Sequence, residues 1–282
     1  MIEHKTLRWT SPLGFNDPFD TQTRIVATNG GDERFVQAFT ERYREILFGE
    51  VLPAYFKSDN ELHRIAAVVR NEPDGAKHEA VERFRRGALA IGENLDPILA
   101  KFSAEISSHL QHGQVFCLTE DINNVVMWSH YAEDHKGVGF KFRVLDELDH
   151  PFRVARKVNY SRHYVNMGSA QEIADHLFEV RTIDMVALCW ELVHLKHADW
   201  AYEREWRCYW PLLDRDAPAG FTDYVQDASL FEAVYLGCCM SDGDAQDLVE
   251  LVRHHLPATS VLKARKSTEN FDLQFEPIYS PR

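Results

Sequence analysis

The sequence predicts an α+β fold in which a mixed β-sheet, continuous or split, carries a helical insertion or cap between its first and second strands. Between about residues 32 and 112, apolar side chains recur at spacings of three and four, as in amphipathic helices; short alternating or apolar runs elsewhere are typical of strands. Because 282 residues with 45% hydrophobic content can bury a sizeable core, we predict a single domain over residues 1–282 that contains the insertion 32–112.

The first predicted strand is the alternating run 7–10, and it leads into the turn Phe15-Asn16-Asp17-Pro18-Phe19-Asp20. Side-chain oxygens of Asn16 and Asp17 can accept hydrogen bonds from the backbone nearby, and Pro18 has a fixed φ angle. We therefore expect a rigid loop at this position.

Four helices are predicted in the insertion. The helical spacing runs from about Phe35 to Leu47 and again from Leu62 to Val69, and the segment 71–75, which contains Pro and Gly, interrupts it. The third and fourth helices are expected over about 76–90 and 95–111. The block carries no pattern of chemically active residues, so we interpret it as a cap.

The rest of the chain is richer in strands. Its predicted strands are 115–119, 138–143, 154–160, 202–210, 233–236, 260–266 and 272–277, and its predicted helices are 125–136, most of 169–197, and 244–255. Residues 121–124 offer side chains that can cap the helix at 125, and Gly137 is its expected C-terminal cap.

Two carboxylates and a guanidinium are predicted to share one face of the strand 202–210. The period of two places Glu203, Glu205 and Arg207 on the same side. Like charges this close raise the pKa of at least one carboxyl, and an Arg opposes that effect, so the group is a candidate catalytic pair. The alternative is a ladder of salt bridges on an exposed face.

A second polar segment is Met127-Trp128-Ser129-His130-Tyr131-Ala132, on the helix predicted for 125–136. Trp128 and Tyr131 form an aromatic stripe, and His130 and Asp134 have the i,i+4 spacing that lets a carboxylate orient an imidazole. Ser129 and His130 point in different directions on a helix, which argues against a Ser-His-Asp triad. The alternative is an aromatic core stripe with a hydrogen-bonded His at its edge.

Metal and glycine-rich nucleotide sites are not predicted. The pairs His109/His112 and His194/His197 each lack an evident third ligand. The sequence contains no G-x-G-x-x-G, no G-x-x-x-x-G-K-[ST], no G-x-S-x-G and no H-E-x-x-H.

Charge and hydropathy exclude several other classes. A net charge of −13 repels a phosphate backbone, so general nucleic-acid binding is not expected. No apolar run reaches the roughly 20 residues of a membrane span, and the first residues lack the apolar stretch of a secretory signal. The five cysteines contain no C-x-x-C and are interpreted as reduced thiols. We therefore expect a cytoplasmic protein with no membrane partner.

Separated motifs in the chain resemble a widespread bacterial family named only as domain of unknown function 2971. The motifs lie in the order typical of that family, between about residues 7 and 237. They are Phe15 to Asp20, Met127 to Ala132 with His135 to Phe140, Lys196 with Trp200 and Tyr202 to Arg207, and Tyr235 to Gly237.

The layout of this family looks like that of ADP-ribosyltransferase-like folds, in which a split sheet holds NAD in a cleft. That resemblance implies NAD or a related nucleotide as substrate. It makes Glu205 the acid that contacts the ribose, and Glu203 the group that orients or deprotonates the acceptor. A nearby carboxylate stabilises the positive charge of an oxocarbenium-like transition state. Thr119, at the end of a strand, would take the place of the usual hydroxyl residue.

Such enzymes also carry an Arg or His on an early strand, and many family members have an additional strand and helix before the Asn-Asp-Pro turn. Here about fourteen residues precede that turn. Three interpretations stay open. Either Arg8 takes the place of this early Arg or His, or the motif that carries that residue is absent, or Met1 is not the natural start.

Three functions follow as hypotheses: a transferase-like enzyme, a non-catalytic ligand-binding or sensing module, and a metal-dependent hydrolase or nuclease. The predicted catalytic residues are Glu205, Glu203, His130 and Tyr131. The predicted substrate-binding residues are Arg8, Asn16, Asp17, Thr119, Trp128, Ser129 and Arg207.

Overall fold

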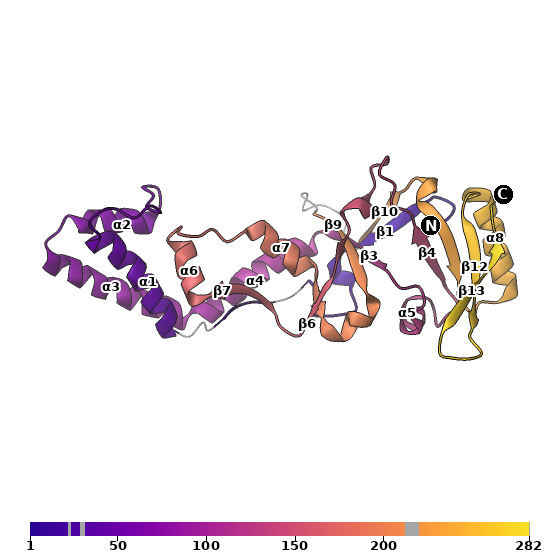
Figure 1. The fold of residues 1–282 in the computed structure, drawn as a ribbon, viewed down its shortest axis with the longest axis horizontal. Helices are drawn as coiled ribbons and strands as arrows, with labels where there is room; N and C mark the ends of the chain where they lie inside the picture. Colours follow the sequence, from indigo (N-terminus) through magenta and orange to yellow (C-terminus); the bar gives the residue numbers. More distant parts are fainter. Residues whose placement is uncertain (22–23, 29–31, 212–219, 282) are drawn as a thin grey trace. The chain divides into compact units, whose positions relative to one another are not determined.

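The computed structural model describes residues 1–21, 24–28, 32–211 and 220–281. The chain forms two compact units (Figure 1). Unit 1 comprises residues 1–21, 110–162 and 194–282, and unit 2 comprises residues 22–109 and 163–193. The described residues contain helices and four β-sheets, which confirms the predicted α+β class.

The first sheet of unit 1 has five strands, paired antiparallel. Their order is β10 (Phe221–Val225), β1 (Thr6–Thr10), β3 (Gln114–Thr119), β9 (Glu205–Trp210) and β5 (Arg156–Lys157). In the β3–β9 pairing, Thr119 is opposite Glu205 and Cys117 is opposite Arg207. This register brings the polar ends of two strands to one place.

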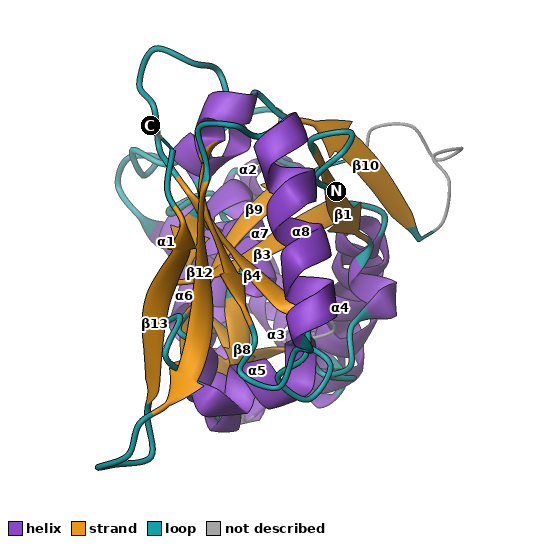
Figure 2. Ribbon diagram, turned by 90° about the vertical axis from the view of Figure 1, so that its right-hand side faces the viewer, coloured by secondary structure: helices purple, strands orange, loops and turns teal. Residues whose placement is uncertain are grey.

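The second sheet of unit 1 has four strands in the order β13 (Leu273–Tyr279), β12 (Ser260–Lys266), β11 (Phe231–Leu236) and β4 (Val138–Phe142). The parallel strands β11 and β12 are connected through α8 (Asp242–His255), which packs on one face of this sheet (Figure 2). Side chains alternate across β11, so Val234 and Leu236 join the α8 core while Tyr235 packs with Trp128 on the other side.

Short elements complete unit 1. The helix α5 (Val125–Tyr131) follows β3, and β6 (Asn159–Ser161) pairs in parallel with β8 (Leu195–His197). The 3-10 helices are η1 (Pro12–Gly14), η2 (Pro151–Val154), η3 (Ala198–Glu203) and η4 (Ala228–Leu230).

Unit 2 is a helical block around an aromatic core. Its helices are α1 (Asp32–Phe48), α2 (Glu61–Arg70), α3 (Asp74–Glu93), most of α4 (Leu95–Gln111), α6 (Ala170–Leu177) and α7 (Met185–Val193), and β2 (Ile25–Thr28) pairs with β7 (Val165–Ser169). Phe39 stacks on Phe35 and Phe84 and meets Phe178 edge-on. The spacing of three and four in the sequence predicted Phe35 and Phe39 on one face of α1, whereas the contacts of Phe84 and Phe178 emerge only from the structure.

The structure corrects several predicted boundaries. The helix predicted for 125–136 ends at Tyr131, because Glu133, Asp134 and His135 all adopt positive φ angles. The strand predicted for 202–210 begins at Glu205, after a 3-10 turn. The strand predicted for 154–160 is two short strands, β5 and β6. The sequence analysis missed β2, β7, β8 and β10. Because β2 precedes α1, the helices α1 to α4 lie between the second and third strands and not between the first and second.

None of the helices in the described residues is long and apolar enough to cross a membrane.

We predict that Leu236→Ala lowers the free energy of unfolding by about 2–5 kcal/mol, because it leaves a cavity in a filled core. Leu236 is fully buried, whereas the control, Leu13, has 61% of its surface exposed. Leu13→Ala should change stability by about 0.5 kcal/mol or less. Urea unfolding measures both, and equal losses would contradict the packing described for β11.

Candidate functional site

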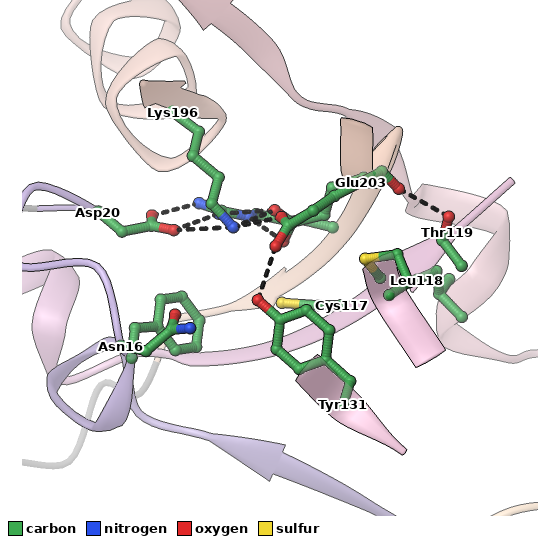
Figure 3. Close-up of a pocket in the computed structure, with 12 residues that line it drawn as sticks. Asn16, Asp20, Cys117, Leu118, Thr119, Tyr131, Lys196 and Glu203 are labelled. Atoms are coloured by element: carbon green, nitrogen blue, oxygen red, sulfur yellow. Dashed lines mark hydrogen bonds and ion pairs between the residues drawn. The ribbon is translucent and has the colours of Figure 1, made fainter. Parts of the chain in front are cut away.

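Separate segments of unit 1 surround a cavity of about 320 Å³ (Figure 3). The loop after η1, the end of β3, α5, β8, η3 and β9 each contribute side chains. The lining residues are Phe15, Asn16, Asp20, Cys117, Leu118, Thr119, Met127, Tyr131, Lys196, Glu203, Glu205 and Arg207.

Lys196 on β8 is one of two buried cations beside the cavity. Its Nζ lies 2.5 Å from Glu203 Oε2, 3.1 Å from Glu205 Oε2 and 3.7 Å from Asp20 Oδ2. Burial lowers the pKa of this ammonium, but the carboxylates, Glu205 foremost, outweigh burial and raise it above its ordinary value. Lys196 therefore stays charged and is not a free amine nucleophile.

Arg207 on β9 is the second cation and is fully buried. Its Nε and Nη2 donate to the two oxygens of Glu205 at 2.7 and 3.0 Å, and Nη1 and Nη2 donate to those of Asp20 at 2.7 and 2.6 Å. Such forked pairing satisfies a guanidinium that has lost its water. The cluster contains three carboxyl groups and two cations.

The cations affect the two carboxyl groups differently. Desolvation raises the pKa of Glu205, but Arg207 and Lys196 together outweigh it and lower the pKa to about 2. For Asp20, desolvation prevails over Arg207 and Lys196, and the pKa is raised. Glu205 is therefore a firmly ionised anchor for both cations.

Tyr131 on α5 donates a 2.6 Å hydrogen bond to Glu203 Oε1. Burial, and then Glu203, raise the pKa of Tyr131, while a hydrogen bond from Asn16 lowers it in part. The phenol therefore remains a hydrogen-bond donor at neutral pH.

The two glutamates differ in how fully their oxygens are used. A carboxylate has about four acceptor positions. Glu205 accepts from Lys196, twice from Arg207, and from the Cys117 thiol. Among the described residues, Glu203 accepts only from Tyr131 and Lys196. Glu203 is therefore the carboxylate with capacity left for a ligand.

A kink brings the two glutamates together. Glu203 ends η3, Arg204 has a left-handed conformation with φ of 46°, and the strand begins at Glu205. Thr119 Oγ1 donates to the carbonyl of Glu203 at 2.7 Å, and the amide of Glu205 donates to Tyr160 Oη at 2.8 Å. The prediction that Glu203 and Glu205 lie on one face of a single strand is thus wrong, because only Glu205 belongs to the strand. Both carboxylates nevertheless reach the same cavity.

Six residues predicted from the sequence line the cavity: Asn16, Thr119, Tyr131, Glu203, Glu205 and Arg207. Both glutamates are buried, at 2% and 4% exposed, so the alternative of a salt-bridge ladder on an exposed face does not describe them.

The other predicted site residues are not in the cavity lining, and each has another contact. Arg8 pairs with Asp223, and Asp17 caps its own turn by accepting from the Phe19 amide. Trp128 is buried and donates through Nε1 to the Ile122 carbonyl, as its core-stripe alternative predicts.

Ser129 and His130 also have partners outside the cavity lining. Ser129 Oγ donates to the Val125 carbonyl and lies 3.0 Å from His135 Nε2. His130 Nδ1 lies 3.2 Å from Tyr202 Oη. The predicted i,i+4 partnership of His130 with Asp134 is wrong, because the helix ends at Tyr131.

The sequence analysis gave no role to Asp20, Lys196 or Cys117. Asp20 closes the Phe15 to Asp20 motif, and Lys196 is a single cation in the mostly apolar run 192–196, which was the available signal. Cys117 is solvent-accessible within the cavity lining but has protein atoms closely around it, and this desolvation, followed by the charge of Glu205, raises the pKa of its thiol. In the part of the chain that the structure describes, no group of three or more His, Cys, Asp or Glu side chains is placed to hold a metal ion.

The fold and the cavity together define an α+β protein with a small pocket whose charged side chains are buried. Residues 127–208 match the model of the family described as "Protein of unknown function (DUF2971)", which confirms the resemblance predicted from the sequence. The matched segment carries Tyr131, Lys196, Glu203, Glu205 and Arg207. Comparisons with curated proteins and with solved structures gave no match.

We predict that Arg204→Val lowers the free energy of unfolding by about 1–2 kcal/mol, because a β-branched residue resists a left-handed backbone. Arg204→Gly is the matched control. It also loses the ion pair with Asp121, yet it should stay within about 1 kcal/mol of the wild type. Chemical denaturation measures the stability of both variants. Equal stabilities of Arg204→Val and Arg204→Gly would contradict the left-handed conformation at this position.

We predict that Glu205→Gln is less stable than the wild type at pH 7 and that the difference shrinks in acid. The lowered pKa means that ionised Glu205 stabilises the fold above its unfolded pKa, near 4.5, and that this is lost as the pH falls towards about 2. The effect corresponds to about 3 kcal/mol.

Urea unfolding between pH 7 and 2 measures this difference. Glu250→Gln, on an exposed position of α8, is the control and should follow the wild type. A constant gap between Glu205→Gln and the wild type over the whole range would contradict the assignment.

Proposed function

We propose that the cavity binds the nicotinamide-ribose end of NAD or of a related nucleotide, and that the protein is an ADP-ribosyltransferase-like enzyme. The observation that supports this most directly is Glu203, a buried carboxylate held by Lys196 and Tyr131 with acceptor positions left over. Ribose hydroxyls are donors that suit those positions.

The charge of the cluster agrees with such a ligand. With all five groups ionised, three carboxylates and two cations leave one negative charge, which favours a cationic ring such as nicotinamide in its riboside form. Phe15 and Tyr131 add aromatic surface to the lining. Both cations are engaged by carboxylates, so a phosphate group would have to lie elsewhere.

In the proposed reaction the bond between ribose C1 and the nicotinamide nitrogen breaks. Its electron pair goes to the ring, and neutral nicotinamide leaves. The remaining oxocarbenium-like ribosyl group then forms a bond with a nucleophilic atom of the acceptor, and the proton of that atom passes to solvent water. Glu203 stabilises the developing positive charge. Glu205 holds Lys196 and Arg207 in place, so the geometry favours Glu203 as the ribose-facing acid.

The rest of a dinucleotide needs space beyond the charged cavity. A cavity of about 320 Å³ is at the small end of the roughly 300–1,000 Å³ typical of ligand sites. Leu118 and Thr119 also line a neighbouring cavity of about 570 Å³, whose walls include Phe142, Trp206 and Tyr235. A second aromatic ring of the ligand could stack there.

A second candidate is a sensing module that binds the ligand without breaking a bond. The full hydrogen-bonding of Glu205 and the raised pKa of Lys196 favour it, because neither group is then available as a base.

We predict that wild-type protein releases nicotinamide from NAD and that Glu203→Gln lowers this rate by about 10²–10³-fold. The amide keeps the shape and one acceptor oxygen but not the charge, so the shift in melting temperature caused by NAD should persist. Nicotinamide release by chromatography and thermal unfolding with and without NAD are the measurements. Glu191→Gln, on an exposed position of α7, is the control and should retain activity.

The outcomes separate the candidates. A melting-temperature shift without any turnover in wild-type protein supports the sensing module. No turnover and no shift would refute both uses of NAD. Phosphodiesterase activity that EDTA abolishes would instead support the metal-dependent hydrolase.

A further inference from the structure

A second cavity, of about 620 Å³, lies beside the adjacent cysteines Cys238 and Cys239, which follow β11. Its wall includes His135 and the loop 266–273 between β12 and β13, and it shares no lining residue with the charged pocket. Cys239 is exposed and Cys238 is partly exposed. Both thiols are therefore accessible from a cavity that the proposed function does not use.

The backbone holds this pair of thiols in place. The Cys239 amide donates to the His135 carbonyl at 2.9 Å, and the Gly237 amide donates to the Gly137 carbonyl at 3.0 Å. A Cβ at Gly237 would collide with the His135 carbonyl oxygen, so the close approach requires glycine. The two sulfurs lie 3.8 Å apart.

An internal disulfide fits this pair poorly. Consecutive Cα atoms across a trans peptide are about 3.8 Å apart, whereas disulfides usually join Cα atoms about 4.4–6.8 Å apart. If a further atom bridges the two sulfurs, the ring closed by the two side chains and the peptide bond between them becomes larger. The short distance between the Cα atoms then no longer prevents ring closure. The arrangement therefore favours a bridged dithiol over a disulfide.

We propose that Cys238 and Cys239 form a bidentate dithiol site for a trivalent arsenical. The two sulfurs replace oxygen on arsenic: with phenylarsine oxide the arsenic–oxygen bond breaks, two arsenic–sulfur bonds form, and the two thiol protons leave with the oxygen as one water. Arsenic stays trivalent, so the step needs no oxidant or reductant.

Desolvation, and then the neighbouring Cys239, raise the pKa of Cys238, so this sulfur carries a proton before the condensation and the proton leaves in the water that forms. The cavity leaves space beside the sulfurs for the organic group on arsenic.

The test is to incubate the reduced full-length chain with one equivalent of phenylarsine oxide. We expect one adduct per chain by intact mass and the loss of two of the five thiols to a thiol reagent. The adduct should survive excess glutathione, a monothiol, and should be removed by dithiothreitol, a dithiol. Chelation by two sulfurs is what resists the monothiol.

Single substitutions locate the site. Cys238→Ser and Cys239→Ser should each abolish the glutathione-resistant adduct, whereas the control Cys189→Ser should retain it; circular dichroism checks that each variant is folded. The proposal is overturned if no adduct forms, if glutathione removes it, or if it persists in Cys239→Ser.

Discussion

The burial of Arg207 and Lys196 is the constraint on which the rest of unit 1 depends. A cation removed from water is costly unless opposite charges and hydrogen bonds surround it. Here the compensating groups come from distant parts of the chain, with Asp20 near its start and the two glutamates near residue 204. The elements that carry these groups must therefore meet, and the cavity forms where they meet.

This network also explains the irregular backbone around it. The kink at Arg204 and the 3-10 turn before it let Glu203 and Glu205 approach Lys196 from two directions, which a continuous strand would not allow. One carboxylate is then saturated and the other retains acceptor positions. That asymmetry is the physical basis for giving the two glutamates different roles.

The segment 125–137 connects the charged pocket to the dithiol pair. Tyr131, at the end of α5, reaches Glu203, and the left-handed turn that follows accepts the backbone hydrogen bond from Cys239. Trp128, between them in the same segment, is buried against the sheet that holds Ala264. Both proposed sites thus use one short segment that is fixed by its own core contacts.

The sequence by itself determined the α+β class, the helical block, the resemblance of residues 127–208 to the family model, and most of the acidic pocket residues. Those follow from local periodicity and motif order, which are properties of neighbouring residues. Only the tertiary structure decided that Asp20 and Lys196 belong to the cluster, and that His130, Trp128 and Arg8 lie outside the cavity lining. These outcomes depend on which distant groups pair with a buried charge, and residue spacing carries no record of that pairing.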